Sequence, residues 1–181
     1  MCSSDLSGES GGLNESTSDI FGTVVEYYAN NGGDIGDYLI GEKLYKSGTG
    51  ALRFMYKPSL DGRSANCWSS TVGGLDVHYS SGVGNHFFYL LAEGSAPAGG
   101  PASPTCVSGN TKKATGSAAL SGIGRDKAGK IWYRALTVYM TSGTNYAAAR
   151  TATLNAAADL YGAGSAEQAA VAAAWSAVLV N

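Results

Sequence analysis

The sequence predicts a mainly α-helical fold, with about five helices joined by long loops. Apolar residues recur at helical spacing in several segments; near the C-terminus they are Val171, Ala174, Trp175 and Val178. A capping residue precedes most of these segments, and glycine or Thr-Ser-Gly follows several of them. The chain shows no internal repeat, and its 181 residues are enough for one domain with a core of its own.

The first helix is expected between residues 14 and 30, with Asn14 as its N-cap. The apolar run IFGTVVEYYAN belongs to this helix and indicates that it packs deeply. A glycine-rich loop with several acids, NGGDIGDYLIGE, comes next. Residues 43–77 should be irregular, with short extended pieces at 43–45 and 75–78.

The second helix should begin near residues 80–81 and carry the segment VGNHFFYLLAEG. Residues 94–122 are rich in glycine, serine, alanine and proline, and should form a long surface loop. Three more helices should follow, with Asp126, Asn145 and Ser165 as their caps.

The charge content argues against several classes of partner. Charged residues make up 14% of the chain, against about 25% in an average domain, and the net charge is −2. Without a basic stripe, nucleic acid and anionic membranes are poor partners, and no apolar stretch approaches the roughly 20 residues of a membrane span. A surface kept wet by hydroxyl and amide groups suits a secreted protein.

The cysteines indicate an oxidising compartment. Cys67 and Cys106 lie in loop-like sequence, and neither belongs to a C-x-x-C pair, which argues against a zinc finger or a thioredoxin motif. A Cys67–Cys106 disulfide is the favoured interpretation, and two free thiols are the alternative.

The first six residues, MCSSDL, are expected to be a non-native leader. They have neither the charged n-region nor the apolar h-region of a signal peptide. CSSDL is also encoded by TGCTCTTCCGATCT, a string that resembles a sequencing-library adapter. We therefore expect the domain to comprise residues 7–181, and the natural chain to continue upstream.

Glu15 and Asp19 lie four residues apart, and therefore on one side of the first helix. One interpretation is an exposed first turn in which the helix dipole favours both acids. The apolar residues that follow argue for burial, and a buried carboxylate needs a cation or several hydrogen-bond donors. A metal ion bound by Glu15, with Asp19 orienting a second ligand such as a histidine, would meet that need.

Five stretches, in order along the chain, resemble the thermolysin family of zinc metallopeptidases. They are SGGLNESTSDIFG, ALRFM, LDVHYSSGVGNHFFYLLAEG, GIGRDKAGKIWYRAL and NAAADLYG. The resemblance runs from about Ser7 to the C-terminus, and it implies the family's helical C-terminal domain.

The resemblance implies part of a zinc site. In that family two histidines of an H-E-x-x-H helix and one glutamate of the next helix bind zinc, and the glutamate of H-E-x-x-H is the general base. Glu15 matches the third ligand, and Asp19 matches an aspartate that hydrogen-bonds a zinc-bound histidine. The sequence has no H-E-x-x-H, since its two histidines are His78 and His86. The missing helix should lie upstream of Ser7, so the chain alone is expected to be inactive.

The resemblance also implies residues that act on the substrate. His78 matches the histidine thought to stabilise the oxyanion, and Asp76 can accept a hydrogen bond from its ring. Arg53 matches the arginine that binds the substrate carbonyl. The alternatives are a surface His–Asp pair and a structural salt bridge. His86 has no nearby residue that completes a site, so it is expected to be structural.

Two further sites are implied. An apolar pocket for the side chain after the cleaved bond would be lined by Ile40, Leu44 and Leu52. A calcium site would have as ligands Glu26, Asp37, the Leu39 carbonyl and Glu42. Oxygen donors in a glycine-rich loop suit calcium, and solvated loop acids are the alternative.

The sequence therefore predicts a secreted, zinc-dependent endopeptidase that acts on peptide or protein substrates. Zinc and calcium are the implied cofactors, and the missing N-terminal half of the enzyme is an implied partner. A non-catalytic, calcium-stabilised binding module, or a pseudo-enzyme, is the alternative. The peptidase assignment requires Glu15 and His78 to face one another across one open cleft.

Overall fold

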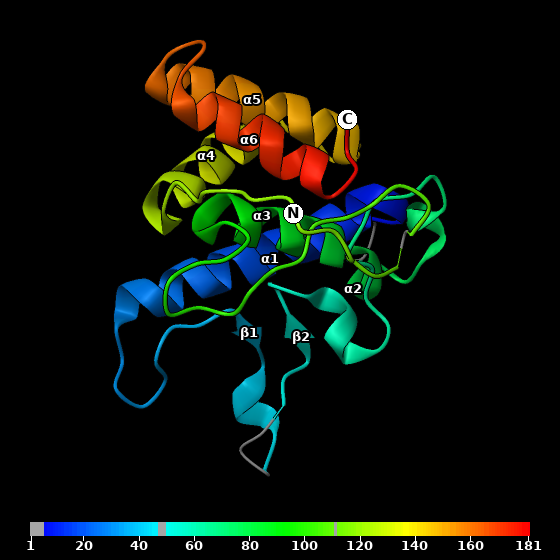
Figure 1. Cartoon of the computed structure of the whole chain (residues 1–181), viewed down its shortest axis with the longest axis vertical. Helices are drawn as coiled ribbons and strands as arrows, with labels where there is room; N and C mark the ends of the chain where they lie inside the picture. The colour runs from blue at the N-terminus through cyan, green and yellow to red at the C-terminus, as the bar shows by residue number, and fades with distance from the viewer. Residues whose placement is uncertain (1–5, 47–49, 111) are drawn as a thin grey trace.

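A computed structural model describes residues 6–46, 50–110 and 112–181 of the chain. It is mainly helical, as the sequence predicts (Figure 1). The α-helices are α1 (Gly8–Ala29), α2 (Val77–Ser80), α3 (Gly82–Glu93), α4 (Arg125–Val138), α5 (Tyr146–Tyr161) and α6 (Ala166–Ala177). The short strands β1 (Leu39–Ile40) and β2 (Arg53–Phe54) pair antiparallel. In Figure 1 these strands lie on one side of α1, and α4, α5 and α6 lie on the other.

Helix α1 begins at Gly8, so the predicted start at Asn14 is wrong. The prediction rested on Asn14 as an N-cap, and the glycines that precede it are unfavourable inside a helix. Here they permit close packing against α2: a Cβ at Gly11 would lie 2.4 Å from Val77 Cγ1, and one at Gly12 would lie 2.4 Å from Ser80 Oγ.

The apolar face of α1 is only partly as expected. Ile20 is fully buried, and Phe21 and Val24 pack against the core from partly buried positions. Val25, which the apolar run also assigned to the packed side, is 62% exposed.

Helix α3 is the centre of the core, because every residue from Gly82 to Ala92 is buried. The Phe87 ring stacks on Trp175 of α6, with 3.7 Å between ring centroids, and contacts Trp132 of α4 at 6.0 Å. The predicted second helix is therefore confirmed, although the structure divides its start between α2 and α3.

His86 lies inside α3 and is fully buried. Its Nδ1 is 2.8 Å from the Asn66 carbonyl oxygen, and its Nε2 is 2.9 Å from Ser103 Oγ. Burial lowers the pKa of this imidazole to about 4, since removal from water disfavours the charged form. The structural role expected for His86 agrees with this position.

Two of the three N-caps predicted for the C-terminal helices are confirmed. Asn145 accepts a hydrogen bond from the backbone N–H of Ala148 at 2.9 Å, and the Ser165 side chain likewise caps α6. Asp126 does not cap α4, because that helix begins at Arg125 and Asp126 falls in its first turn.

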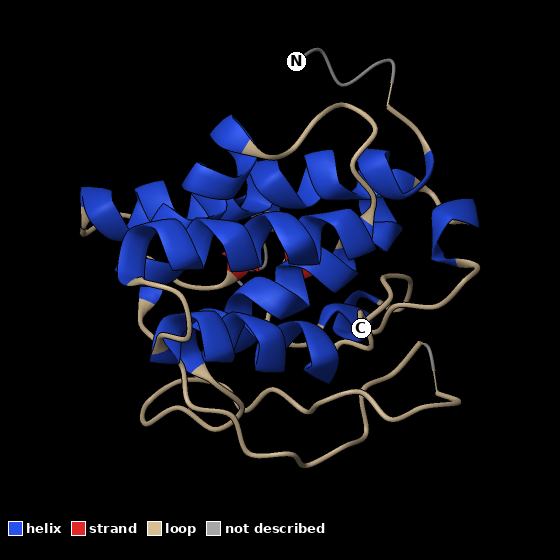
Figure 2. Cartoon of the chain, turned by 90° about the horizontal axis from the view of Figure 1, so that it is seen from above, coloured by secondary structure: helices blue, strands red, loops and turns tan. Residues whose placement is uncertain are grey.

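The segment between α3 and α4 contains no helix among its described residues, and it runs along one side of the helices (Figure 2). The predicted Cys67–Cys106 disulfide is present, with 5.8 Å between the Cα atoms. Beside it, the Cys106 N–H donates to the Ala177 carbonyl and the Trp68 N–H donates to the Val178 carbonyl, both at 2.8 Å. The bridge therefore joins the two loop segments, and these hydrogen bonds hold both of them against the end of α6.

Both predicted extended pieces are wrong. Residues 43–45 overlap a 3-10 turn at Glu42–Leu44, and residues 75–78 lead into α2. The side chain of Asp76 explains the second difference, because it caps α2 and so favours a helical start. Within the described residues, no helix is both long and apolar enough to cross a membrane.

Candidate active site

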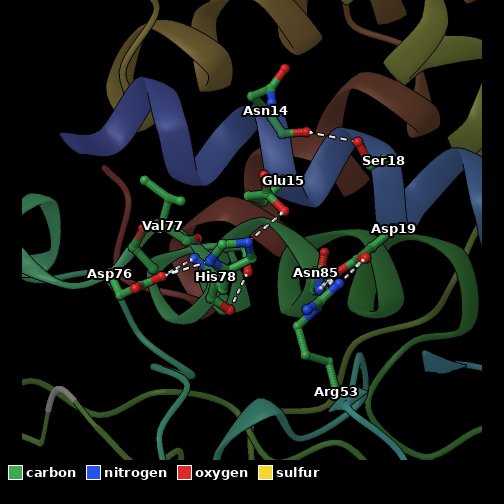
Figure 3. A network of polar contacts seen from close by, with 11 residues as sticks. Asn14, Glu15, Ser18, Asp19, Arg53, Asp76, Val77, His78 and Asn85 are labelled. Atoms are coloured by element: carbon green, nitrogen blue, oxygen red, sulfur yellow. Dashed lines mark hydrogen bonds and ion pairs between the residues drawn. The ribbon is translucent and has the colours of Figure 1, made fainter. Parts of the chain in front are cut away.

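Glu15 and Asp19 project from the same side of α1, toward α2, α3 and β2 (Figure 3). Glu15 lies well beyond the first turn of α1, and 20% of its side chain is exposed. Asp19 is only 5% exposed. The interpretation of these acids as an exposed first turn is therefore wrong, and each carboxylate needs a partner.

Asp19 is held by two side chains from other elements. Arg53 on β2 donates from Nε and Nη2 to the two carboxylate oxygens, both at 2.7 Å. Asn85 on α3 donates from Nδ2 to Asp19 Oδ2, also at 2.7 Å. The bidentate contact with Asp19 raises the pKa of Arg53. Arg53 thus makes the salt bridge that the sequence left as an alternative, and its substrate-binding role stays a prediction.

Asp76 positions His78 at the start of α2. Its Oδ1 accepts the backbone N–H of His78 at 2.9 Å and lies 2.8 Å from the ring Nδ1. Both contacts lower the pKa of the Asp76 carboxyl, and the backbone hydrogen bond contributes most. The expected contact is present, but it arises from a helix cap rather than from an extended chain.

The imidazole of His78 faces the carboxylate of Glu15 (Figure 3). Its Nε2 lies 3.6 Å from Glu15 Oε2, and 56% of the His78 side chain is exposed. Asp76 contacts Nδ1, and Nε2 is the ring atom that points toward Glu15. The two residues thus face one another on one side of the domain, as the peptidase assignment requires, and the open cleft between them stays a prediction.

The three residues predicted for the apolar pocket gather around β1 and β2. The Ile40 carbonyl accepts the Leu52 N–H at 2.8 Å. A Cβ at Gly41 would lie 2.8 Å from Leu52 Cδ1 and 3.4 Å from Leu44 Cδ1. Leu44 is 71% exposed and Leu52 is 46% exposed, so both offer apolar surface to a ligand.

The predicted calcium ligands come together only in part. Carboxylate oxygens of Glu26, Asp34 and Glu42 lie within 4.8 Å of one another, and burial together with neighbouring acids raises the pKa values of Glu26 and Glu42. Asp37 instead donates its N–H to Glu26 and accepts the N–H of Leu39 at 2.7 Å.

Two residues of these sites were not singled out from the sequence, namely Asp34 and Asn85. Asp34 was visible only as one of several loop acids. Asn85 carried a clearer signal, because an amide inside the apolar run VGNHFFYLL must be buried and therefore needs a partner. Its Oδ1 is buried and has no hydrogen-bond partner among the described residues.

Comparisons with known proteins identify the family of this domain. Residues 4–180 match the family model described as thermolysin metallopeptidase, alpha-helical domain. The chain is 52% identical over 178 residues to the transglutaminase-activating metalloprotease of Streptomyces mobaraensis, covering 97% of this chain and 22% of that protein. It is 43% identical over 178 residues to a bacillolysin of Bacillus cereus, covering 96% of this chain and 28% of the relative.

A thermolysin of Alicyclobacillus acidocaldarius is 41% identical over 175 residues, which are 94% of this chain and 28% of that protein. The chain thus spans 22–28% of the length of these curated relatives. The helical fold and the family match over nearly the whole chain agree, and the chain belongs to the thermolysin metallopeptidase family as its alpha-helical domain.

Proposed function

We propose that this domain supplies one zinc ligand and the transition-state residues of a zinc-dependent endopeptidase. The observation that carries the proposal is the facing pair of Glu15 and His78, 3.6 Å apart. The Asp19–Arg53 ion pair, on the same side of α1, supports it.

The Glu15 carboxylate fits one ligand position of a zinc site. Glu15 is partly buried, and its carboxylate faces the His78 imidazole rather than a lysine or arginine. A single carboxylate suits the third place in a set of two histidines and one glutamate, and an upstream H-E-x-x-H helix would supply the other two ligands and the general base. When bound, zinc polarises the peptide carbonyl and lowers the pKa of its water.

Asp19 and Asn85 would orient that upstream helix. The Asp19 carboxylate can accept another hydrogen bond beyond those from Arg53 and Asn85, for example from the ring N–H of a ligand histidine. The unpartnered Oδ1 of Asn85 supports a further donor at this place.

His78 and Arg53 would act on the substrate. With Nδ1 held by Asp76, the Nε2–H of His78 can donate to the oxyanion that develops on the attacked carbonyl. Arg53 would donate to a substrate carbonyl near the cleaved bond, while its contacts with Asp19 keep the guanidinium in place. Ile40, Leu44 and Leu52 would then contact an apolar side chain just after that bond.

Calcium and secretion belong to the same proposal. The carboxylates of Glu26, Asp34 and Glu42 offer hard oxygen ligands; Asp37 is hydrogen-bonded to Glu26, and the Leu39 carbonyl would be a further ligand. The Cys67–Cys106 disulfide supports an extracellular location, since such bonds persist in oxidising compartments.

The same acidic cluster supports a second candidate, a non-catalytic domain stabilised by calcium. The deciding experiment is to sequence the source DNA across the codon for Ser7, and then to express the complete reading frame. An in-frame H-E-x-x-H, together with zinc-dependent cleavage of a casein substrate that Glu15→Gln abolishes, supports the peptidase. A reading frame without that motif, and a purified protein without peptidase activity, would leave the calcium-stabilised domain.

A further inference from the structure

Four tyrosines from separate segments surround a cavity of about 430 Å³: Tyr27, Tyr38, Tyr56 and Tyr89. The ring centroids of Tyr38 and Tyr89 lie 4.6 Å apart edge to face, and those of Tyr56 and Tyr89 lie 5.9 Å apart. This volume is within the range of about 300–1,000 Å³ that small-molecule sites occupy. None of the proposed zinc ligand or transition-state residues lines the cavity.

The charges in the cavity are unequal, with two carboxylates against one guanidinium. Glu93, Asp37 and Arg125 all line it. Arg125 is already engaged, because its Nη1 lies 2.7 Å from Glu93 Oε1 and its guanidinium carbon lies 3.8 Å from the centroid of the Tyr27 ring. Asp37 adds a second negative charge, and Arg125 is the only cationic side chain among the described residues that line the cavity.

An anionic ligand fits this cavity poorly. To bind one, Arg125 would have to give up Glu93, whose Oε1 also accepts the Tyr38 hydroxyl at 2.6 Å. A cation has no such cost, since it meets aromatic faces and an excess of negative charge. The position of Arg125 over Tyr27 shows that a guanidinium group can lie over a tyrosine ring within this cavity.

We propose that this cavity binds a guanidinium group, such as the arginine side chain of a peptide. Tyr56 would supply the aromatic face, because its ring is only partly buried and lines the same cavity as Asp37. The segment between Pro97 and Pro101 forms another wall, and the Tyr89 hydroxyl fixes it by donating to the Pro101 carbonyl.

The ligand series that tests this proposal compares a cation with a neutral compound of the same shape, and adds an anion. The purified protein is titrated by calorimetry with N-acetyl-arginine amide, with its neutral isostere N-acetyl-citrulline amide, and with N-acetyl-glutamate amide. One fixed calcium concentration keeps the acidic cluster beside Asp37 in the same state throughout. The arginine compound should bind at least about fivefold more tightly than the citrulline compound, as expected for a cation against aromatic rings. Equal affinities, or tighter binding of the glutamate compound, would overturn the proposal.

Variants then locate the binding. Tyr56→Phe keeps the ring and should retain affinity, whereas Tyr56→Leu should lose about fivefold or more. Tyr28→Leu is the matched control, because Tyr28 is 91% exposed and does not line the cavity. An unchanged affinity in Tyr56→Leu would place the ligand elsewhere. Should that variant not fold, ring-proton NMR of the unsubstituted protein decides, since the Tyr56 signals must shift with the arginine compound, at lower concentrations than with the citrulline compound; no shift with the arginine compound would overturn the proposal.

Discussion

Acid should destabilise the domain through one residue, His86. The pKa of this imidazole falls from 6.5 to about 4 in the folded protein, because burial disfavours its charged form. Between these values the unfolded chain binds a proton on His86 that the folded chain does not. The free energy of unfolding should therefore fall as the pH falls, by up to ~1.4 kcal/mol per pH unit and by ~3 kcal/mol over the whole window.

The assay compares two variants that differ only at this position. The chain contains two histidines, so His78→Gln leaves His86 as the sole imidazole, and His78→Gln/His86→Gln removes it. Glutamine keeps one donor and one acceptor for the Asn66 carbonyl and the Ser103 hydroxyl. Urea unfolding between pH 4 and pH 7, followed by tryptophan fluorescence, gives the free energy of unfolding for each variant.

Other groups that titrate in this window are common to both variants. The raised pKa values of Glu26 and Glu42 act in the opposite direction, because the folded protein then binds protons before the unfolded chain does. The difference between the two pH profiles therefore isolates His86. A difference that stays constant across the window would refute the reasoning, since it would mean that His86 takes up its proton equally in both states.

Three further predictions follow from the contacts described above. In the proposed zinc peptidase, His78→Gln should lower kcat/KM by about 10²–10³-fold, because it removes an oxyanion donor. The zinc content, measured by atomic absorption, should stay unchanged. A loss of zinc would assign His78 a different role. Replacing Cys67 and Cys106 by serine opens a link between residues 39 positions apart, and should lower the free energy of unfolding by ~2–4 kcal/mol in denaturant titrations. Gly12→Ala should lower the free energy of unfolding by ~1–3 kcal/mol, because its Cβ would meet Ser80 Oγ at 2.4 Å. Gly22→Ala on the same helix meets nothing within 4 Å and should raise the free energy of unfolding by up to ~1 kcal/mol. Equal melting temperatures of the two variants would contradict the packing of α1 on α2.

The features that the sequence predicted correctly are mostly local. Asn145 and Ser165 cap their helices because a cap needs only the backbone of the next turn. The apolar face predicted for the last helix is also confirmed, since Val171, Ala174 and Trp175 are fully buried at the spacing of one helix face. The disulfide was predicted because few pairings were open to the cysteines.

The features that the sequence missed depend on contacts between distant segments. The early start of α1 depends on glycines that admit Val77 and Ser80, sixty or more positions away along the chain. Asp34 joins the acidic cluster only because the loop folds back toward Glu42. The facing pair of Glu15 and His78 came from the family resemblance, because no local pattern brings α1 and α2 together.

The position of the disulfide bears on when the domain can finish folding during synthesis. Both cysteine-bearing segments are hydrogen-bonded to the carbonyls of Ala177 and Val178, at the end of α6. A chain that emerges vectorially from a ribosome or a translocon exposes Cys67 and Cys106 well before it exposes that surface. Until α6 is made, the two thiols lack these hydrogen-bonded supports. Oxidation of the thiols in their native position is therefore coupled to the final docking of α6. An oxidant that acts earlier would act on an unfinished domain.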